Sequence, residues 1–139
     1  MAAENPPAPE IRQPYAEHLN LREGQSEAGV GTAYMTIAEI HRQGAGVVQG
    51  GLLTALADHA FYLAVRSTLN PGEDTTTIEL KLNFLAPARE GELTATAKLI
   101  SRGRRIVVGT MEIVDQNQTQ IAVGLGTYII IRAPGAPSS

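Results

Sequence analysis

The segment "QGGLLTALADHAFYLAV", Gln49 to Val65, determines how the rest of this chain is interpreted. It begins with two glycines, continues with Leu, Ala and Val, and contains one carboxylate, Asp58. The apolar residues would cover most sides of a helix, which is typical of a helix that is buried inside a domain. The stop signal "NPG" follows at Asn70 to Gly72, so the sequence predicts a helix over Leu52 to Leu69.

Strand-like segments lie on both sides of this helix. Residues Ala28 to Ile37 favour a strand, and a short helix is expected before them, over Ile11 to Leu21. Four further segments alternate in hydropathy or are rich in β-branched residues: Thr75 to Leu85, Leu93 to Ile100, Ile106 to Val114 and Ile121 to Ile131. Short polar joints between them are typical of hairpins. The predicted order is one strand, the long helix and then four strands in an antiparallel meander. A single apolar helix needs a curved sheet around it, so the sequence predicts an α+β domain with one long central helix wrapped by a curved antiparallel sheet of about five to six strands.

Alternation assigns the side chains of two of these strands to opposite faces of the sheet. In the first strand after the helix, one face is expected to hold Ile78, Leu80, Leu82 and Phe84, and the other Thr77, Glu79, Lys81 and Asn83. In the next strand the apolar face is expected to hold Leu93, Ala95, Ala97 and Leu99.

Composition limits the classes of function. The chain has 139 residues and no cysteine, which excludes disulfides and a cysteine nucleophile. Its formal net charge of −3 argues against bulk nucleic-acid binding. No segment reaches the roughly 20 apolar residues that span a bilayer, so no membrane partner is expected and a cytoplasmic location is the default. Residues 11–132 are expected to form one domain, between flexible segments at 1–10 and 133–139.

Asp58 has two interpretations on the predicted helix. Residues four apart lie on one line along a helix, and the line through Asp58 holds Thr54, Tyr62 and Arg66. These four side chains form either a solvated edge, which is the usual setting of an aspartate, or a functional stripe on an otherwise apolar helix.

The two glycines favour the functional interpretation. Gly50 and Gly51 stand where a capping Ser, Thr or Asp is usual, and they leave backbone N–H groups uncovered at the positive end of the helix dipole. Such a site suits a developing oxyanion. Gly50 lies about 12 Å from Asp58 along the helix axis. A substrate that meets both residues therefore lies beside the helix, or the two residues come from different subunits.

Other motifs of catalysis are missing from the sequence. No serine lies in a nucleophile elbow, and "GAGVVQGG" lacks the Lys-Ser/Thr ending of a phosphate loop. No metal site is expected, because the histidines, His18, His41 and His59, do not have the spacing of metal ligands.

The helix, its glycines, its aspartate and the strand "TTTIELKLNFLAPA" together resemble the hotdog-fold acyl-CoA thioesterases, in particular the branch of phenylacetyl-CoA and hydroxybenzoyl-CoA thioesterases. The resemblance extends from Ala28 to Ile131. In that family the motif N-x-x-G-x-x-H-G-G precedes the central helix, and an acidic residue follows nine positions after the His. The corresponding stretch here is "QGAGVVQGG", and Asp58 follows nine positions after Gln49.

The resemblance implies roles for particular residues. Asp58 would be the catalytic carboxylate, as nucleophile or general base, and Gly50 would offer the oxyanion N–H group. Gln43 would orient the attacking water or the carbonyl, and Thr77 would lie near the water. The substrate would also be met by Gln49 and Gly51.

A basic turn and two departures from the family pattern bear on coenzyme A binding. The turn "SRGRR" would lie close to the coenzyme A phosphates and consists of Ser101, Arg102, Gly103, Arg104 and Arg105. Gln49 replaces the usual His, so a helix-capping amide remains where the family has an imidazole. "NFLAPA" replaces the frequent "NFLRPA", so Ala86 removes a possible phosphate contact.

The resemblance also implies an acyl-CoA substrate, no separate cofactor, and a homo-oligomer that is a dimer or a dimer of dimers. A non-catalytic acyl-CoA-binding or regulatory module is the alternative that Gln49 favours. A hydratase would need a His and acid pair, but adjacent His59 and Asp58 point about 100° apart on a helix. The acyl group is open: an aromatic or a medium-chain acyl group would fit a pocket lined by Leu53, Leu56 and Phe61.

Overall fold

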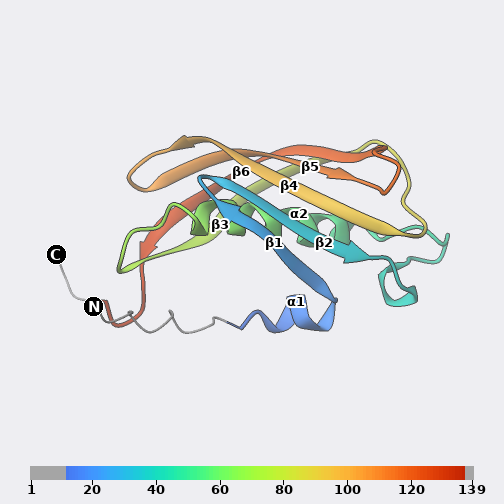
Figure 1. Ribbon diagram of the computed structural model, residues 1–139, viewed down its shortest axis with the longest axis horizontal. Helices are drawn as coiled ribbons and strands as arrows, with labels where there is room; N and C mark the ends of the chain where they lie inside the picture. Colours follow the sequence, from blue (N-terminus) through green and yellow to red (C-terminus); the bar gives the residue numbers. More distant parts are fainter. Residues whose placement is uncertain (1–11, 137–139) are drawn as a thin grey trace, which may run out of the picture.

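The computed structural model describes residues 12–136, in which a sheet and one long helix account for most of the chain (Figure 1). The elements are α1 (Pro14–His18), β1 (Leu21–Glu27), β2 (Val30–Thr36), a 3-10 turn (Glu39–His41), α2 (Gly50–Arg66), β3 (Glu73–Phe84), β4 (Glu92–Arg102), β5 (Ile106–Val114) and β6 (Gln120–Arg132). The segment 1–10 and residues 137–139, for which flexibility was expected, lie outside the described residues. No helix within 12–136 has both the length and the apolar content needed to cross a membrane.

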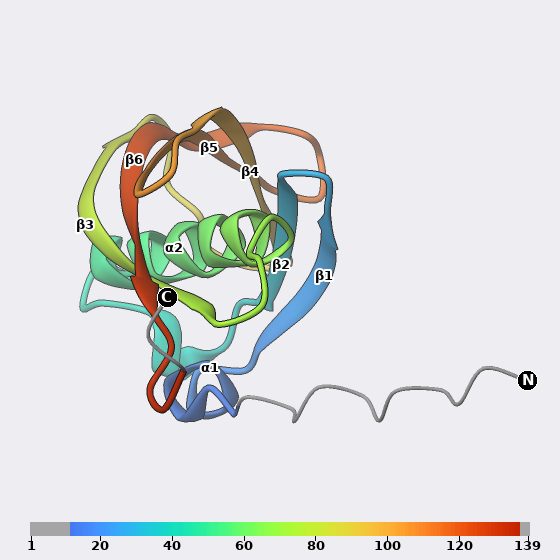
Figure 2. The same ribbon diagram turned by 90° about the vertical axis from the view of Figure 1, so that its left-hand side faces the viewer.

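The six strands found within residues 12–136 belong to one antiparallel sheet in the order β1-β2-β4-β5-β6-β3. Figure 2 shows this sheet curving around α2, which confirms the predicted α+β arrangement of one long central helix inside a curved sheet. The predicted meander is wrong in one respect, because β3 pairs with β6 and β4 lies beside β2. The reason is that α2 carries the chain across the concave face, so that β3 begins at the opposite edge of the sheet.

The core lies between α2 and the concave face of the sheet. The apolar face predicted for β4 is confirmed, since Leu93, Ala95 and Ala97 are fully buried and Leu99 packs against the core. Close contact of β2 with α2 depends on Gly31, where an added Cβ atom would lie 2.1 Å from the carbonyl oxygen of Ala60. Leu53, Leu56 and Phe61 are buried in this core rather than exposed to a ligand, because their side of α2 faces the sheet.

The N-terminal part differs from the prediction. The helix expected over Ile11 to Leu21 is limited to Pro14–His18 among the described residues, and Leu21 already begins the strand β1. Between them Asn20 has a positive φ of 57°, which turns the chain out of the helix. The strand β1 was missed because it is an edge strand in which Leu21 alone is buried, so its sequence does not alternate in hydropathy.

A β-bulge changes the predicted faces of β3. The pairing with β6 shifts register between Thr77 and Glu79, which leaves Ile78 54% exposed. Thr77 therefore faces α2 before the bulge, and Leu80 and Leu82 pack against the core after it. The strict alternation that placed Ile78 with Leu80 and opposite Thr77 was wrong, because a bulge adds one residue to the strand and reverses its alternation.

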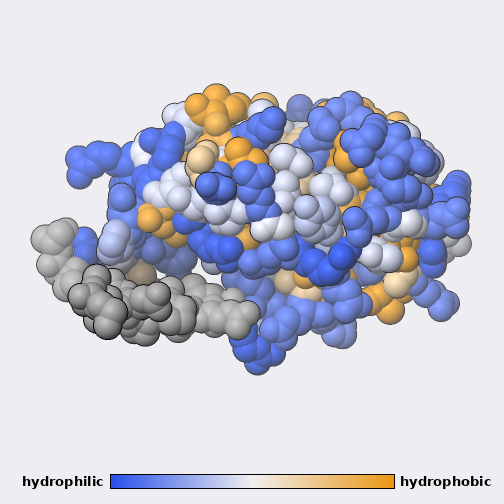
Figure 3. Space-filling model, viewed as in Figure 1, coloured by the Kyte–Doolittle hydropathy of each residue, from blue (hydrophilic) through white to orange (hydrophobic). Residues whose placement is uncertain are grey.

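The edge strand β3 also carries apolar side chains that the core does not bury. Ile78, Phe84 and the following Leu85 are 54%, 52% and 53% exposed. On the face shown in Figure 3, hydrophilic side chains predominate and hydrophobic ones form small separate groups. The apolar side chains on β3 matter because an edge strand also presents unpaired backbone groups.

Candidate active site

The carboxylate of Asp58 lies between α2 and the strands β3 and β6. Its Oδ1 atom accepts a hydrogen bond of 2.9 Å from the Thr77 hydroxyl and a short one from the Tyr128 hydroxyl. Thr77 comes from β3 and Tyr128 from β6, where the two residues are directly paired across the strands. The structure thus brings together the predicted residues Asp58 and Thr77 with a tyrosine that sequence reasoning missed.

Tyr128 is held firmly in this arrangement. Its side chain is 3% exposed, and its ring meets Phe61 edge to face, with 4.6 Å between centroids and 89° between planes. Its hydroxyl also lies 3.0 Å from the backbone carbonyl oxygen of Asp58. Burial, and then the negative charge of Asp58, raise the pKa of Tyr128 well above its ordinary value. Tyr128 is therefore a permanent donor near neutral pH.

The polar stripe of α2 is only partly open to solvent. Thr54, Asp58, Tyr62 and Arg66 are all half-buried. Thr54 donates to the carbonyl oxygen of Gly50 at 2.9 Å, and Arg66 forms an ion pair of 3.2 Å with Glu23. This stripe is therefore bonded to neighbouring parts of the fold and is not a freely solvated edge.

The N-terminus of α2 is built from Gln49 and the two glycines. Gln49 is the cap of the helix, and its side-chain oxygen accepts a hydrogen bond of 3.2 Å from the Leu52 N–H group. A Cβ atom on Gly51 would lie 2.7 Å from that oxygen, so glycine leaves room for the cap. A Cβ atom on Gly50 would lie 3.1 Å from the ring of Phe84. Gln49 thus supplies the helix-capping hydrogen bond that the sequence analysis expected of its amide.

Gln43 lies in the turn that precedes α2. Its side-chain oxygen accepts a hydrogen bond of 2.7 Å from the Ala45 N–H group. Its backbone N–H group donates to the carbonyl oxygen of Val47 at 2.8 Å. In the single chain Gln43 therefore holds its own turn together and does not join the cluster around Asp58.

Apart from the basic turn, the predicted site residues fall into two groups in one chain. Asp58 and Thr77 form one group, whereas Gly50, Gly51, Gln49 and Gln43 form the other, at the N-terminus of α2. The rise of an α-helix places Gly50 and Asp58 about 12 Å apart along the axis.

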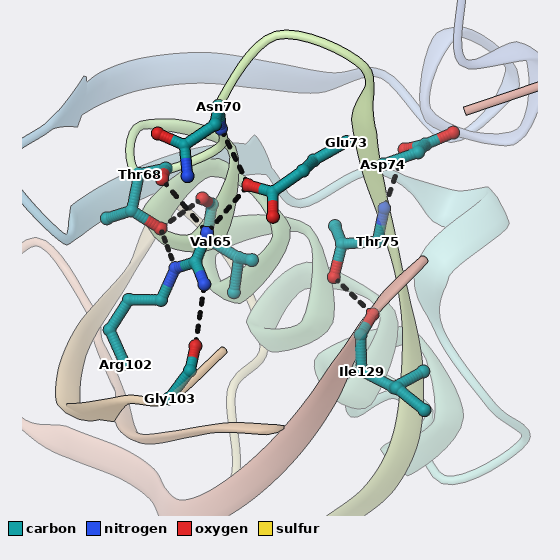
Figure 4. A network of polar contacts seen from close by, with 9 residues as sticks. All are labelled: Val65, Thr68, Asn70, Glu73, Asp74, Thr75, Arg102, Gly103 and Ile129. Carbon is teal, nitrogen blue, oxygen red and sulfur yellow. Dashed lines mark hydrogen bonds and ion pairs between the residues drawn. The ribbon is translucent and has the colours of Figure 1, made fainter. Parts of the chain in front are cut away.

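The basic turn is divided by its contacts, as Figure 4 shows for Arg102. Arg102 donates to Glu73 at 2.9 Å, to the Gly103 carbonyl at 2.6 Å, and to both the hydroxyl and the carbonyl of Thr68. A hydrogen bond from the Asn70 N–H group, followed by the contact with Arg102, lowers the pKa of Glu73. Arg102 thus links the end of β4 to the segment between α2 and β3.

Arg104 and Arg105 are exposed beside this network. They line an open depression of about 590 Å³ together with Asn70, Glu73 and Arg102. A neighbouring depression of about 310 Å³ is lined by the same two arginines and by Arg132 of β6. The sequence missed Arg132 because 26 or more residues separate it from the turn along the chain.

The remaining residues of the turn have backbone roles or face solvent. Gly103 donates its N–H group to the carbonyl oxygen of Ile106 at 2.9 Å, and a Cβ atom there would lie 2.8 Å from that oxygen. Ser101 is exposed on β4.

His59 adjoins Asp58 in sequence but belongs to a different cluster. Its Nδ1 atom lies 2.8 Å from the Tyr15 hydroxyl of α1, and its Nε2 atom lies 3.8 Å from the Glu23 carboxylate of β1. Burial lowers the pKa of His59. Because His59 faces α1 and β1 while Asp58 faces β3 and β6, the two do not form the acid and base pair of a hydratase. No group of three potential metal ligands occurs within 12–136.

Comparison with known proteins finds relatives whose names contain esterase or hydrolase. A protein of Saccharolobus solfataricus with esterase in its name is 40% identical over 87 residues, which are 63% of this chain and 57% of that protein. The chain therefore spans less than two thirds of the length of that relative. The 1,4-dihydroxy-2-naphthoyl-CoA hydrolase of Listeria monocytogenes is 27% identical over 104 residues, which are 75% of this chain and 85% of the hydrolase.

A solved structure and a family model also match this chain. The structure of the Escherichia coli PaaI protein from the phenylacetic acid degradation operon is 30% identical, with a TM-score of 0.80 over 86% of this chain and 85% of that one. The thioesterase superfamily model matches residues 45–122, which is more than half of the chain and includes α2 with Asp58. The chain belongs to the thioesterase superfamily, with the hotdog arrangement of a curved antiparallel sheet around one long helix.

Proposed function

We propose that this chain hydrolyses an acyl-CoA thioester to a free acid and coenzyme A, with Asp58 as the acting carboxylate. The observation that carries the proposal is the arrangement around Asp58, where two hydroxyl groups hold one oxygen of a half-buried carboxylate on the polar stripe of α2. The names of the relatives support the substrate class, since the Listeria protein acts on an aromatic acyl-CoA and PaaI belongs to an operon for phenylacetic acid degradation.

The reaction needs a carboxylate in either of two forms. As a general base, Asp58 takes a proton from water, the water oxygen bonds to the carbonyl carbon, and the carbon–sulfur bond breaks as the thiolate leaves. As a nucleophile, Asp58 bonds to the carbonyl carbon itself, the thiolate leaves, and water then cleaves the resulting anhydride. In both forms negative charge develops on the carbonyl oxygen, and we assign its stabilisation to the Gly50 N–H group.

The proposal includes a second subunit. Gly50 and Asp58 lie about 12 Å apart on one helix, which is too far for one thioester carbonyl to meet both. The edge strand β3 is suited to pair with a copy of itself, because it carries unpaired backbone groups and the exposed side chains of Ile78, Phe84 and Leu85. In such a dimer Asp58 of one subunit would act with Gly50, and with Gln43 near it, of the other.

Coenzyme A phosphates would bind at Arg104 and Arg105. Both guanidinium groups are exposed beside an open depression, and Arg132 lines the adjoining one. Arginine binds phosphate through two parallel hydrogen bonds, which are stronger than ordinary surface contacts. Arg102 is less suited to this role because its donors already bond to Thr68, Glu73 and Gly103.

The test is thiol release from a panel of acyl-CoAs that includes phenylacetyl-CoA, a hydroxybenzoyl-CoA and medium-chain acyl-CoAs. The proposal predicts release of coenzyme A and free acid in equal amounts from at least one of them. A non-catalytic module would bind acyl-CoA, as measured by calorimetry, and release no thiol. A hydratase would change an unsaturated acyl chain and leave the thioester intact. Either of these results would overturn the proposal.

A further inference from the structure

We propose that Tyr128 is a positioning residue for this reaction: it fixes the Asp58 carboxylate so that Oδ2 is the oxygen that reacts. The inference rests on the proposed function and deepens it, since it adds a residue that none of the matched motifs contains. Tyr128 acts through Asp58 and does not itself touch the substrate.

The two hydroxyl groups that bind Oδ1 converge because of the sheet register. Thr77 and Tyr128 are directly opposite each other on β3 and β6, so their side chains lie on the same face of the sheet. The register shift that follows at Ile78 begins immediately after this pair. The bulge therefore lets Thr77 face α2 while Leu80 still reaches the core further along the strand.

The Tyr128 hydroxyl cannot easily move away from Asp58. Its ring is buried and packs edge to face against Phe61, which lies one turn after Asp58 on the same helix. The hydroxyl is close to both the side chain and the backbone carbonyl of Asp58. The donor and the carboxylate are thus fixed to the same turn of α2, and the carboxylate cannot rotate without losing the contact.

The consequence is chemical, because the two carboxylate oxygens are no longer equivalent. Oδ1 accepts both hydroxyl hydrogens, and these bonds stabilise the negative charge on it. Oδ2 accepts neither and keeps its lone pairs for a proton of water or for the carbonyl carbon. A carboxylate whose rotation is blocked in this way is preorganised for attack.

A purely structural role is the competing explanation, since buried tyrosines usually bond their hydroxyl group to some acceptor. The two explanations differ in what happens when only the hydroxyl is removed. A structural hydroxyl contributes to stability alone, whereas a positioning hydroxyl also affects turnover and the orientation of the carboxylate that it binds.

The experiment compares the wild type with Tyr128→Phe, Asp58→Asn and the double variant, with Tyr34→Phe as the matched control. Tyr34 is a half-buried tyrosine of β2, a strand that β4 and β5 separate from β6 and Tyr128 in the sheet. In Tyr128→Phe we expect kcat to fall about 10- to 100-fold, as for loss of a hydrogen bond to a charged group, with KM nearly unchanged. In the Asp58→Asn background the same substitution should have no further effect on kcat.

A second readout does not depend on activity. In a crystal structure of Tyr128→Phe the Asp58 carboxylate should turn or take two orientations, whereas in the wild type it should keep the one orientation that places Oδ1 against both hydroxyl groups. If the wild type releases no thiol, the proposed function fails, yet this comparison of structures still tests the positioning role. An unchanged kcat together with an unchanged orientation of the carboxylate would overturn the inference. A loss of kcat in the double variant beyond that of Asp58→Asn would show that Tyr128 does not act through Asp58.

Discussion

Arg102 of β4 and Glu73 of β3 form a partly buried ion pair of 2.9 Å, and this pair separates the arginines of the basic turn into two kinds. Arg102 donates hydrogen bonds to Glu73 and Thr68 and so stabilises the fold. Arg104 and Arg105 lie beside it and are exposed to solvent. The turn that the sequence presents as one basic cluster therefore has a structural part and a part that is open to a ligand.

Arg102→Ala should lower stability more than it changes substrate binding. The substitution removes hydrogen bonds to Thr68, Glu73 and Gly103 and leaves the Glu73 carboxylate without its cation. We expect a decrease in Tm of roughly 5 °C or more, measured by calorimetry. The control is Arg12→Ala, because Arg12 pairs with Glu17 at a site where both side chains are largely exposed, and its Tm should hardly change. Equal shifts in the two variants would contradict a structural role for Arg102.

Replacing Arg104 and Arg105 together with Ala should raise KM for acyl-CoA and leave kcat nearly unchanged. This pattern is expected when binding energy common to substrate and transition state is lost. The effect should weaken as salt rises and should shrink for an acyl thioester of a short thiol without the nucleotide. Steady-state kinetics on both substrates checks the prediction, and equal increases in KM would show that these arginines do not hold the phosphates.

Protonation of His59 should destabilise the fold at mildly acidic pH. Burial lowers its pKa below the ordinary 6.5, against the opposing effect of Glu23. The unfolded chain therefore takes up the proton first, so stability is full above about pH 6.5 and is lost as the pH falls below it. Tm measured between pH 7.5 and 5.5 should fall more steeply for the wild type than for His59→Gln. The exposed His18→Gln should follow the wild type, and parallel curves for all three proteins would refute the prediction.

The sequence was sufficient to predict the long helix, its aspartate and the four strands that follow it, because each has a strong local pattern. The strand β1 was not predicted, because it lies at an exposed edge and its residues do not alternate in hydropathy. The faces of β3 were misassigned, because no local sequence pattern indicates the bulge at Ile78. Tyr128 could not have been found at all from local pattern. It lies 70 positions from Asp58 inside a β-branched run, and only the pairing of β3 with β6 brings it to the carboxylate.

The division of the site between two subunits can be tested by complementation. Asp58→Ala and Gly50→Ala should each be nearly inactive as homo-oligomers. In Gly50→Ala the added Cβ atom would also lie 3.1 Å from the ring of Phe84, which is a tight contact. A heterodimer isolated through two different affinity tags would contain one intact site and one doubly altered site. It should therefore show about half of the wild-type activity per dimer, as two-fold symmetry requires. A heterodimer as inactive as its parents would place both residues in one subunit's site.

The central claim is that the Asp58 carboxylate performs thioester hydrolysis. Its most direct test is kcat for thiol release by Asp58→Asn, compared with the wild type on the best substrate of the panel. Glu112→Gln serves as the control, because Glu112 is an exposed carboxylate on β5. We predict a decrease in kcat of about 10²-fold or more for Asp58→Asn, with an unchanged oligomeric state and Tm, and wild-type turnover for Glu112→Gln. Near-normal turnover in a folded Asp58→Asn protein would contradict the claim and return Asp58 to a structural role on the polar stripe of α2.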